Sequence, residues 1–598
     1  MTQDTVRIGG ASGYWGDASY ATKQLLGAGN LDFIVYDYLA EITMSIMARA
    51  RAKDPQAGYA TDFVTSALAP NIMQIAEKQV RIISNAGGTN PQACGQAVRD
   101  MIAKTGADLS VAVITGDDLM DRAGQFADQG ITDMFSGEPF PDPGKIASIN
   151  AYLGAFPIAA ALKRGADIVI TGRCVDSAVT LGACIHAFGW EADQFDLLAA
   201  GSLAGHIIEC GSQATGGNFT DWRDAGDLAQ IGYPIVEVEE DGRFTVSKPE
   251  GSTGIVSRGS VGEQMLYEIG DPQAYLLPDV ACDFSDVTIE ESGENQVVVS
   301  GARGNRPPET YKVSATFADG FRAGQLLAFN GFEARAKAQA YGEASIERAR
   351  AILRSLNAPD YDETSIEISG GATGNVDGYE EVMLKAAVRH RDARAVGLFL
   401  REMTGLGLAT PAGMSAFTGG GRARPSPVVR LFSFAVPKSD VQATVDLGEG
   451  PRELELHPDP QDTIGREPMP AAPDQANLPG RSIHVPLIRL AWARSGDKGN
   501  NANIGVMARR PEYMPWIWSA LDEMAIASHF ADYLDGKVAR YYLPGSHSMN
   551  ILLHDVLGGG GIASLRNDAQ GKGYAQLLLA HPIPIPQKLA DSLPSEAA

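Results

Sequence analysis

The sequence predicts an α/β protein with an N-terminal doubly wound parallel-sheet domain, a mixed α/β second domain and a small C-terminal α+β domain. Three observations lead to this prediction. Apolar strand-like runs alternate with helical patterns in the first part of the chain, as in parallel sheets covered by helices. From residue 231 the pattern changes to hairpins and longer helices. A segment rich in Pro, Asp and Glu then precedes the last part of the chain.

The N-terminal domain is expected over residues 1–230. Its strands are nearly continuous apolar runs, which is typical of a parallel sheet buried on both faces. Residues 39–50 carry apolar side chains at helical spacing, and another helix is expected to begin after Asn90 and to end at Gly106. The five predicted strands are 6–10, 32–37, 80–85, 109–115 and 166–171.

The mixed second domain is expected over residues 231–446, with a hairpin turning at Asp241-Gly242 and helices near 331–356 and 379–404. Residues 447–482 are interpreted as a linker, and residues 483–598 as the C-terminal domain. In that domain helices are expected at 511–535 and 570–580, and strands at 484–493, 502–509, 538–544 and 549–556.

Composition excludes several classes of protein. A formal net charge of -24 does not suit a nucleic-acid binder or a protein of anionic membrane surfaces, since both need clustered Lys and Arg. Five irregularly spaced Cys residues form neither a disulfide framework nor a paired zinc motif. No run approaches about 18 apolar residues, the length of a membrane span, and residues 1–10 lack a signal-peptide core. A cytoplasmic protein is therefore expected.

Polar residues follow each predicted strand of the N-terminal sheet. Ligands bind beyond the carboxyl ends of such strands, so we expect these residues to line one cleft. Each group also has a simpler interpretation: the glycines can make turns, the Asp residues can cap helices, and Arg173 can pair with Asp176. The cleft candidates are Asp37, Glu41, Asn85, Gly87, Gly88, Asn90, Asp117, Arg173, Asp176 and Ser177.

His206, Glu209 and Cys210 lie at i, i+3 and i+4, on one face of a predicted helix end. They indicate either an acid/base cluster or a cysteine activated by a neighbouring base. The alternative is a buried Cys flanked by surface His and Glu. No G-x-G-x-x-G fingerprint follows the first strand, and no Walker A motif is present.

Two Gly-rich loops of the C-terminal domain carry cations. The loop at 493–505 contains Arg494 and Lys498, and the loop at 557–573 contains Arg566 and Lys572. Such loops offer free backbone N–H groups beside positive charge, which favours a phosphate or a carboxylate. The alternative is a pair of exposed hairpin loops.

Several long motifs together resemble the acyclic terpene utilisation family, AtuA. They are "RIGGASGYWGDA", "LDFIVYDYLAEITM", "SNAGGTNP", "VITGRCVDSA" and "ECGSQATGGNF". The end of the chain, with "ARSGDKGNNANIGVMAR" and "GGGGIASLRNDAQGKG", resembles the small ferredoxin-like domain of that family. The resemblance implies a bacterial cytoplasmic protein of citronellol- or geraniol-type acid catabolism, in which acids are handled as coenzyme A thioesters.

The leading hypothesis is an enzyme that acts on a branched acyl-CoA or carboxylate by adding or removing water or by cleaving a C–C bond. Glu41 or Asp176 would move a proton next to the thioester, and Arg173 or backbone N–H groups would stabilise the enolate. Coenzyme A enters as part of the substrate. A divalent metal on Asp17, Asp37 or Asp117 stays open, although no ligand spacing specifies it.

Two other hypotheses compete with an enzyme of this kind. The first is a non-catalytic acyl-CoA binding or assembly protein of the pathway, and the second is a nucleotide-dependent ligase. A chain of 63.3 kDa with a small appended domain is also expected to form a homo-oligomer.

Overall fold

The computed structural model describes residues 4–17, 19–374, 376–416, 423–454, 468–474 and 481–594. These residues form two compact units. The first unit comprises residues 1–316, 432–556 and 571–598, and the second comprises residues 317–431 and 557–570. Strands β14 (Thr310–Phe332) and β18 (Ser426–Pro437) each have residues in both units.

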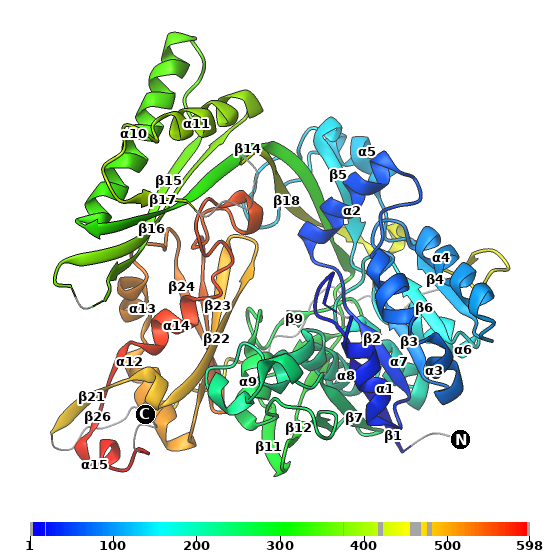
Figure 1. Ribbon diagram of the computed structural model, residues 1–598. Helices are drawn as coiled ribbons and strands as arrows, with labels where there is room; N and C mark the ends of the chain where they lie inside the picture. Colours follow the sequence, from blue (N-terminus) through cyan, green and yellow to red (C-terminus); the bar gives the residue numbers. More distant parts are fainter. Residues whose placement is uncertain are drawn as a thin grey trace. The chain divides into compact units, whose positions relative to one another are not determined.

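The first unit contains a large sheet, part of which is labelled in Figure 1. Neighbouring strands in this sheet lie in the order β11-β12-β8-β7-β1-β2-β3-β6-β4-β19-β20. Neighbouring strands from β1 to β4 in this order are parallel. They are the five strands predicted from the sequence, so the α/β class is confirmed. Their bounds are β1 Thr5–Gly10, β2 Phe33–Tyr36, β3 Arg81–Ser84, β6 Ile168–Thr171 and β4 Val111–Thr115.

Antiparallel strands extend this sheet at both edges. β7 pairs with β1, and the β7–β8 hairpin turns at Gly242, whose φ of 87° favours glycine. The sheet therefore continues past residue 230, while the domain boundaries drawn from the sequence stay a prediction. The edge strands are β7 Ile235–Glu239, β8 Phe244–Ser247, β12 Gln296–Ser300, β11 Thr288–Gly293, β19 Thr444–Asp446 and β20 Arg452–Glu453.

Helices pack against the large sheet because its strands are apolar on both faces. Asn90 caps α4 by accepting a hydrogen bond from the Ala93 N–H, and the helix ends at left-handed Gly106, as predicted. The helices are α1 Ala21–Ala28, α2 Glu41–Lys53, α3 Ile72–Lys78, α4 Pro91–Thr105, α5 Ala123–Asp128, α6 Phe156–Lys163, α7 Ala178–Phe188, α8 Phe195–Ile208 and α9 Arg258–Leu266. β5 (Ile146–Ala151) lies outside this sheet, as does the small sheet of β9 Tyr275–Leu276, β10 Ala281–Asp283 and β13 Arg303–Asn305.

The C-terminal part of the first unit contains an antiparallel sheet with the order β22-β23-β25-β24. The strands predicted at 502–509, 538–544 and 549–556 are present, but the strand predicted at 484–493 is wrong, because a 3-10 turn at Leu487–Arg489 separates β21 from β22. The strands are β22 Ala491–Lys498, β23 Asn501–Ala508, β24 Val538–Leu543 and β25 Ser548–Leu553, and β21 Ser482–Pro486 pairs with β26 Pro582–Pro586. The helices are α12 Met514–Ala520, α13 Glu523–His529, α14 Tyr574–Leu579 and α15 Gln587–Ala590.

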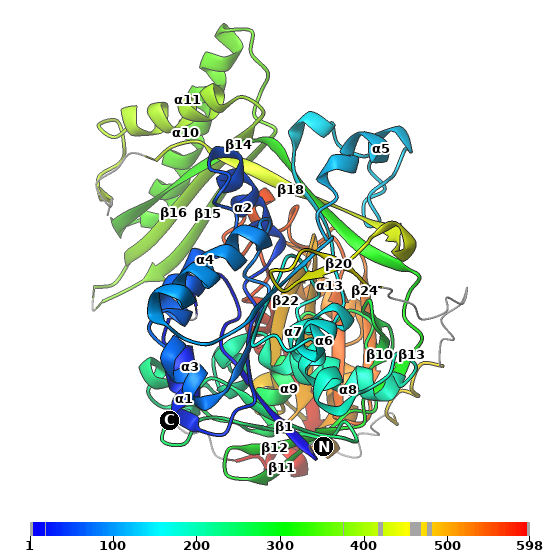
Figure 2. The same ribbon diagram turned by 90° about the vertical axis from the view of Figure 1, so that its right-hand side faces the viewer.

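The second unit is a sheet packed on two helices, α10 (Ala334–Ser355) and α11 (Ala393–Gly405) (Figure 2). Its other strands are β15 Glu363–Ala372, β16 Tyr379–His390 and β17 Met414–Ser415. The helix predicted over 379–404 is wrong in its first half, which is β16. Val382, Leu384 and Ala386 alternate into the core there, and this two-residue period fits a strand.

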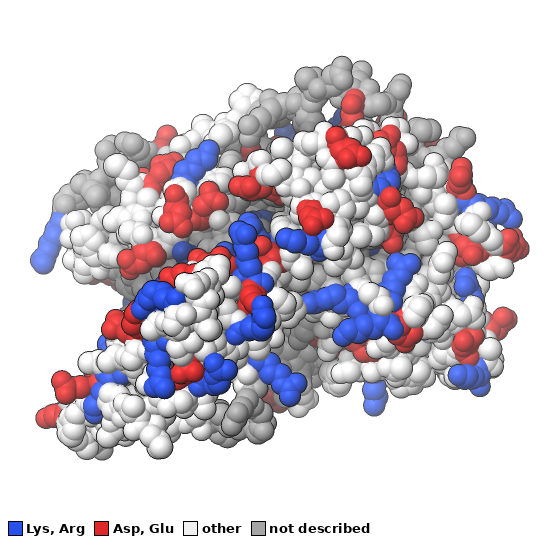
Figure 3. Space-filling view, turned by 90° about the horizontal axis from the view of Figure 1, so that it is seen from above, with Lys and Arg blue, Asp and Glu red and all other residues white. Residues whose placement is uncertain are grey.

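Much of the linker predicted at 447–482 lies outside the described residues, which omit 455–467 and 475–480. Among the residues that are described, no helix is both long enough and apolar enough to span a membrane. Figure 3 shows Lys and Arg side chains interspersed with Asp and Glu on the face that it draws.

Asp221 joins two distant segments of the first unit. Its carboxylate accepts two hydrogen bonds from the Arg509 guanidinium, at 2.6 and 2.7 Å, and one from Trp492 Nε1 at 2.7 Å. The guanidinium also lies 4.9 Å from the Trp492 ring centroid. Half-burial alone raises the pKa of Asp221, but the bonds from Arg509 and Trp492 bring it below its ordinary value.

We expect Asp221→Asn to lower the free energy of unfolding by about 1–3 kcal/mol at neutral pH, since charge-assisted bonds are lost. The folded-state pKa of Asp221 is depressed, so its contribution is present above its unfolded pKa of about 3.9 and disappears as the pH falls below it. Urea unfolding of both proteins at a series of pH values measures this. An equal difference at neutral and low pH would contradict the expectation.

Candidate functional site

The polar residues at the strand ends come together, but they are buried. The Asn85 side-chain N–H group donates to Asp37 Oδ1, and Asn85 Oδ1 accepts from the Tyr38 N–H at 2.8 Å. Asp117 Oδ2 accepts from the Arg173 N–H at 2.8 Å and from Asn150 Nδ2 at 2.9 Å. Burial raises the pKa of Asp37 well above its ordinary value and that of Asp117 to about 7. This arrangement differs from the expected open cleft, because these side chains hold the backbone of the strand ends.

The segment 84–90 also has a mainly structural role. Asn90 Nδ2 donates to the carbonyl groups of Pro55 and Ala57, in addition to the cap on α4. Gly88 has a φ of 52°, and a Cβ there would lie 2.2 Å from Met47 Sδ. Gly87 is equally crowded, and Ser177 is buried at the start of α7. These contacts favour the interpretation of the glycines as turn residues over that of a ligand cleft.

The guanidinium group of Arg173 does not reach solvent. Its side chain is only 4% exposed, and Nη1 donates to Asp176 Oδ1 and to the Leu39 carbonyl, both at 2.8 Å. Its Cζ lies 4.2 Å from the Tyr152 ring centroid. The fixed carboxylate and the ring contact favour a positioning role for Arg173, while the expected role in stabilising an enolate stays a prediction.

Glu41, the first residue of α2, forms a second charged group. Its Oε1 accepts a hydrogen bond from the Tyr152 hydroxyl at 2.6 Å and lies 3.6 Å from Lys312 Nζ. Burial raises the pKa of Glu41, but Lys312, Arg173 and Lys498 together bring it well below its ordinary value. The Glu41 carboxylate is therefore ionised at neutral pH.

His206 and Glu209 form a buried pair at the end of α8. Nδ1 of the ring lies 2.9 Å from Glu209 Oε1, and Nε2 lies 3.2 Å from the Met265 carbonyl. Glu209 Oε2 is buried and has no hydrogen-bond partner among the described residues. Burial alone lowers the pKa of His206, but the charge and the hydrogen bond of Glu209 raise it above its ordinary value. Burial also raises the pKa of Glu209. The pair can therefore share one proton.

Cys210 does not fit the prediction of an activated nucleophile. Both ring nitrogens of His206 have other partners, and burial raises the pKa of the Cys210 thiol well above its ordinary value, with a further increase from Glu209. The thiolate, which is the reactive form, is thus disfavoured.

We expect Cys210→Ala to leave turnover nearly unchanged and native Cys210 to react slowly with iodoacetamide. Mass spectrometry of the alkylated peptide, before and after unfolding in urea, measures the second effect. Rapid alkylation of Cys210 in the folded protein would show that the thiol is activated after all.

Three of the four predicted C-terminal cations meet in one cluster. Lys498 Nζ lies 2.8 Å from Glu268 Oε2, and Lys572 Nζ donates to Asp497 Oδ1 at 3.1 Å and to the Tyr267 hydroxyl. The Arg494 guanidinium lies 4.4 Å from the Tyr267 ring centroid. Arg566 belongs to the second unit.

Glu268 is held in a strained conformation. Its φ of 58° is in the left-handed region, which a non-glycine residue adopts at a cost of order 1–3 kcal/mol. The Asn503 side chain fixes this conformation, because its Oδ1 accepts from the Glu268 N–H at 2.9 Å and its Nδ2 donates to the Leu266 carbonyl at 2.7 Å. Together with its ion pair to Lys498, this conformation makes Glu268 a candidate site residue.

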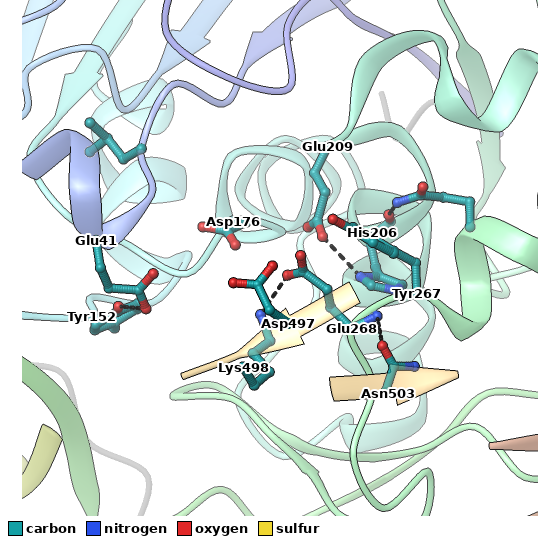
Figure 4. A network of polar contacts seen from close by, with 12 residues as sticks. Glu41, Tyr152, Asp176, His206, Glu209, Tyr267, Glu268, Asp497, Lys498 and Asn503 are labelled. Atoms are coloured by element: carbon teal, nitrogen blue, oxygen red, sulfur yellow. Dashed lines mark hydrogen bonds and ion pairs between the residues drawn. The ribbon is translucent and has the colours of Figure 1, made fainter. Parts of the chain in front are cut away.

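Lys498 connects the charged groups of the site electrostatically. Burial lowers its pKa, but Glu268, Tyr275, Asp176 and Glu41 raise it well above the ordinary value. The Lys498 side chain is nevertheless 51% exposed. In Figure 4, Glu209, Asp176, Glu268 and Lys498 lie close together, and Glu41 with Tyr152 lies to one side. Such a site combines buried carboxylates with a half-exposed lysine side chain whose ammonium is paired with Glu268.

Tyr152, Lys312, Tyr267 and Glu268 were not predicted as site residues. None lies in a Gly-rich loop or at the end of a parallel strand, so neither of these two sequence patterns points to them. Among the described residues, no group of three or more His, Cys, Asp and Glu side chains is arranged to hold a metal ion.

Comparison with protein families gives two matches. Residues 6–447 match the model of the acyclic terpene utilisation family protein AtuA, and residues 485–584 match the AtuA ferredoxin-like domain. A search of curated proteins finds no match. Because the first match covers well over half of the sequence, the chain belongs to the acyclic terpene utilisation family AtuA and ends in the ferredoxin-like domain of that family.

Proposed function

We propose that this chain is an enzyme that moves a proton at the carbon next to the carbonyl of a branched acyl thioester, in a hydration, dehydration or C–C lyase reaction. The observation that carries the proposal is the Glu209 carboxyl group. One of its oxygens is paired with His206, and the other is buried without a partner among the described residues. Lys498 and Asp176 interact with it electrostatically.

Glu209 has the properties of a general base. Burial raises its pKa, which makes its ionised form a stronger base, and His206 orients it. When the proton is removed, the electron pair of the broken C–H bond moves toward the carbonyl oxygen and forms an enolate. Lys498 supports this step, because its half-exposed side chain carries an ammonium, paired with Glu268, that can stabilise the resulting enolate.

The family supports the choice of substrate at a coarser level. Its description ties the chain to the use of acyclic terpenes, whose carbon skeletons are branched. A thioester makes the neighbouring C–H group more acidic than a free carboxylate does, so an enzyme that relies on a carboxylate base gains from that form of the substrate.

The direct test incubates the purified chain with branched acyl-CoA esters in D₂O and follows deuterium uptake and product formation by mass spectrometry. Uptake of one deuterium next to the carbonyl supports the proposal. Tight binding of CoA esters without exchange or turnover would favour a binding or assembly protein. Release of phosphate or pyrophosphate that depends on ATP would favour a ligase.

A further inference from the structure

Tyr152 lies between two cations and a carboxylate. Arg173 Cζ and Lys312 Nζ lie 4.2 and 4.8 Å from its ring centroid. Its hydroxyl donates to Glu41 Oε1 at 2.6 Å, and Ser314 Oγ lies 3.3 Å away. Two cations thus flank the ring, while the Glu41 carboxylate holds the hydroxyl.

The group is assembled from four separate segments. Tyr152 directly follows β5, Glu41 begins α2, Arg173 follows β6, and Lys312 lies on β14 within the first unit. The Tyr152 N–H donates to the Lys312 carbonyl at 3.0 Å, which fixes the two residues side by side. The Tyr152 phenol therefore has a fixed position, as a proton donor in catalysis requires.

In the group formed by Tyr152, Glu41, Arg173 and Lys312, the partly exposed side chains are those of Lys312 and Glu41. Tyr152 itself is 6% exposed, whereas the side chains of Lys312 and Glu41 are 37% and 30% exposed. Glu41 also interacts electrostatically with Lys498, the cation assigned to the enolate. In Figure 4, Glu41 and Tyr152 lie together to one side of Lys498.

We propose that Tyr152 is the general acid that protonates a departing β-hydroxyl group, and that the substrate is therefore a branched β-hydroxyacyl thioester. This inference rests on the proposed function and deepens it. Glu209 acts at the α-carbon, and Tyr152 acts at the β-oxygen.

The atoms of the dehydration balance. Glu209 takes the α-proton, and the electrons of the broken C–H bond form the α,β double bond through the enolate. The C–O bond at the β-carbon breaks, its electrons leave with the oxygen, and the Tyr152 proton completes a water molecule. Tyr152 is left as a phenolate between Arg173 and Lys312, and the proton on Glu209 returns to it through solvent.

The decisive variant is Tyr152→Phe, which keeps the ring between the two cations. It is assayed with a branched β-hydroxyacyl-CoA for dehydration, and with a saturated branched acyl-CoA in D₂O for α-proton exchange. We expect dehydration to fall by at least about 100-fold, the contribution of a general acid, while exchange on the saturated ester continues. Tyr361→Phe is the matched control, since it removes a buried phenol hydroxyl that donates to the Ala395 carbonyl in the second unit.

Two outcomes would overturn the role of Tyr152: undiminished dehydration, or an equal loss of exchange and dehydration, which would make Tyr152 a positioning residue. If thermal melting shows that Tyr152→Phe does not fold, Lys312→Gln replaces it. That variant removes one cation beside the phenol, so it should slow dehydration and spare exchange, and equal effects on both would again reject the role. Absence of both reactions in the unmodified protein would instead reject the proposed function.

Discussion

Glu209→Gln should stop α-proton exchange while leaving the fold intact. The amide keeps the size of the side chain and can still bond to His206, but it cannot accept a proton from carbon. Loss of a general base lowers rates by roughly 10²–10⁴-fold, and both exchange and dehydration should fall by that amount. Mass spectrometry of the saturated ester in D₂O gives the exchange rate, and thermal melting checks the fold.

Glu263 provides a matched control for this variant. It is also a buried glutamate with one oxygen that has no hydrogen-bond partner among the described residues, and burial raises its pKa to about 7. Its other oxygen accepts from the Thr220 N–H at 3.2 Å, and it lies on α9 outside the His206 pair. Glu263→Gln should therefore retain exchange. Equal losses in the two variants would show that a buried carboxylate matters for stability and not for proton transfer.

Arg173→Met should cause the largest loss of stability. The change leaves Asp176 without its partner and removes the stacked guanidinium from Tyr152. Arg173 is buried but the Asp176 side chain is 32% exposed, so the change should cost less than the about 3–5 kcal/mol of a fully buried pair. Arg173→Lys should lose part of the same amount, because an ammonium cannot reproduce the planar contact. Urea unfolding of the three proteins gives these differences.

The exposed pair of Arg243 and Glu239 serves as the comparison for Arg173. Arg243 bonds to Glu239 Oε1 and Oε2 at the protein surface, where ion pairs contribute little. Arg243→Met should consequently leave the unfolding midpoint almost unchanged. If Arg173→Met behaves like Arg243→Met and only weakens binding of an acyl-CoA ester, Arg173 is a ligand-binding residue, as its position after a strand first suggested.

Local patterns in the chain are sufficient to predict the scaffold. Continuous apolar runs mark the five parallel strands because both faces of each strand are buried, and Asn90 and Gly106 mark the ends of α4 because few residues satisfy those backbone positions. Residues 379–390 are harder, since a short apolar segment fits a helix or a strand until its neighbours are known. Pairing with β14 and β15 makes this segment a strand.

The roles of the charged residues depend on contacts between distant segments. Arg173 and Asp37 both follow strands, yet burial and their partners turn them into internal supports, which no local pattern reports. Glu268 and Lys498 are 230 positions apart in sequence and meet at 2.8 Å. Residue type and spacing therefore predict where polar groups leave the sheet. Desolvation and the distances between charged groups decide which of these groups stay accessible, which of them hold a proton and which partner neutralises each one. Desolvation and these distances arise only when the chain is folded.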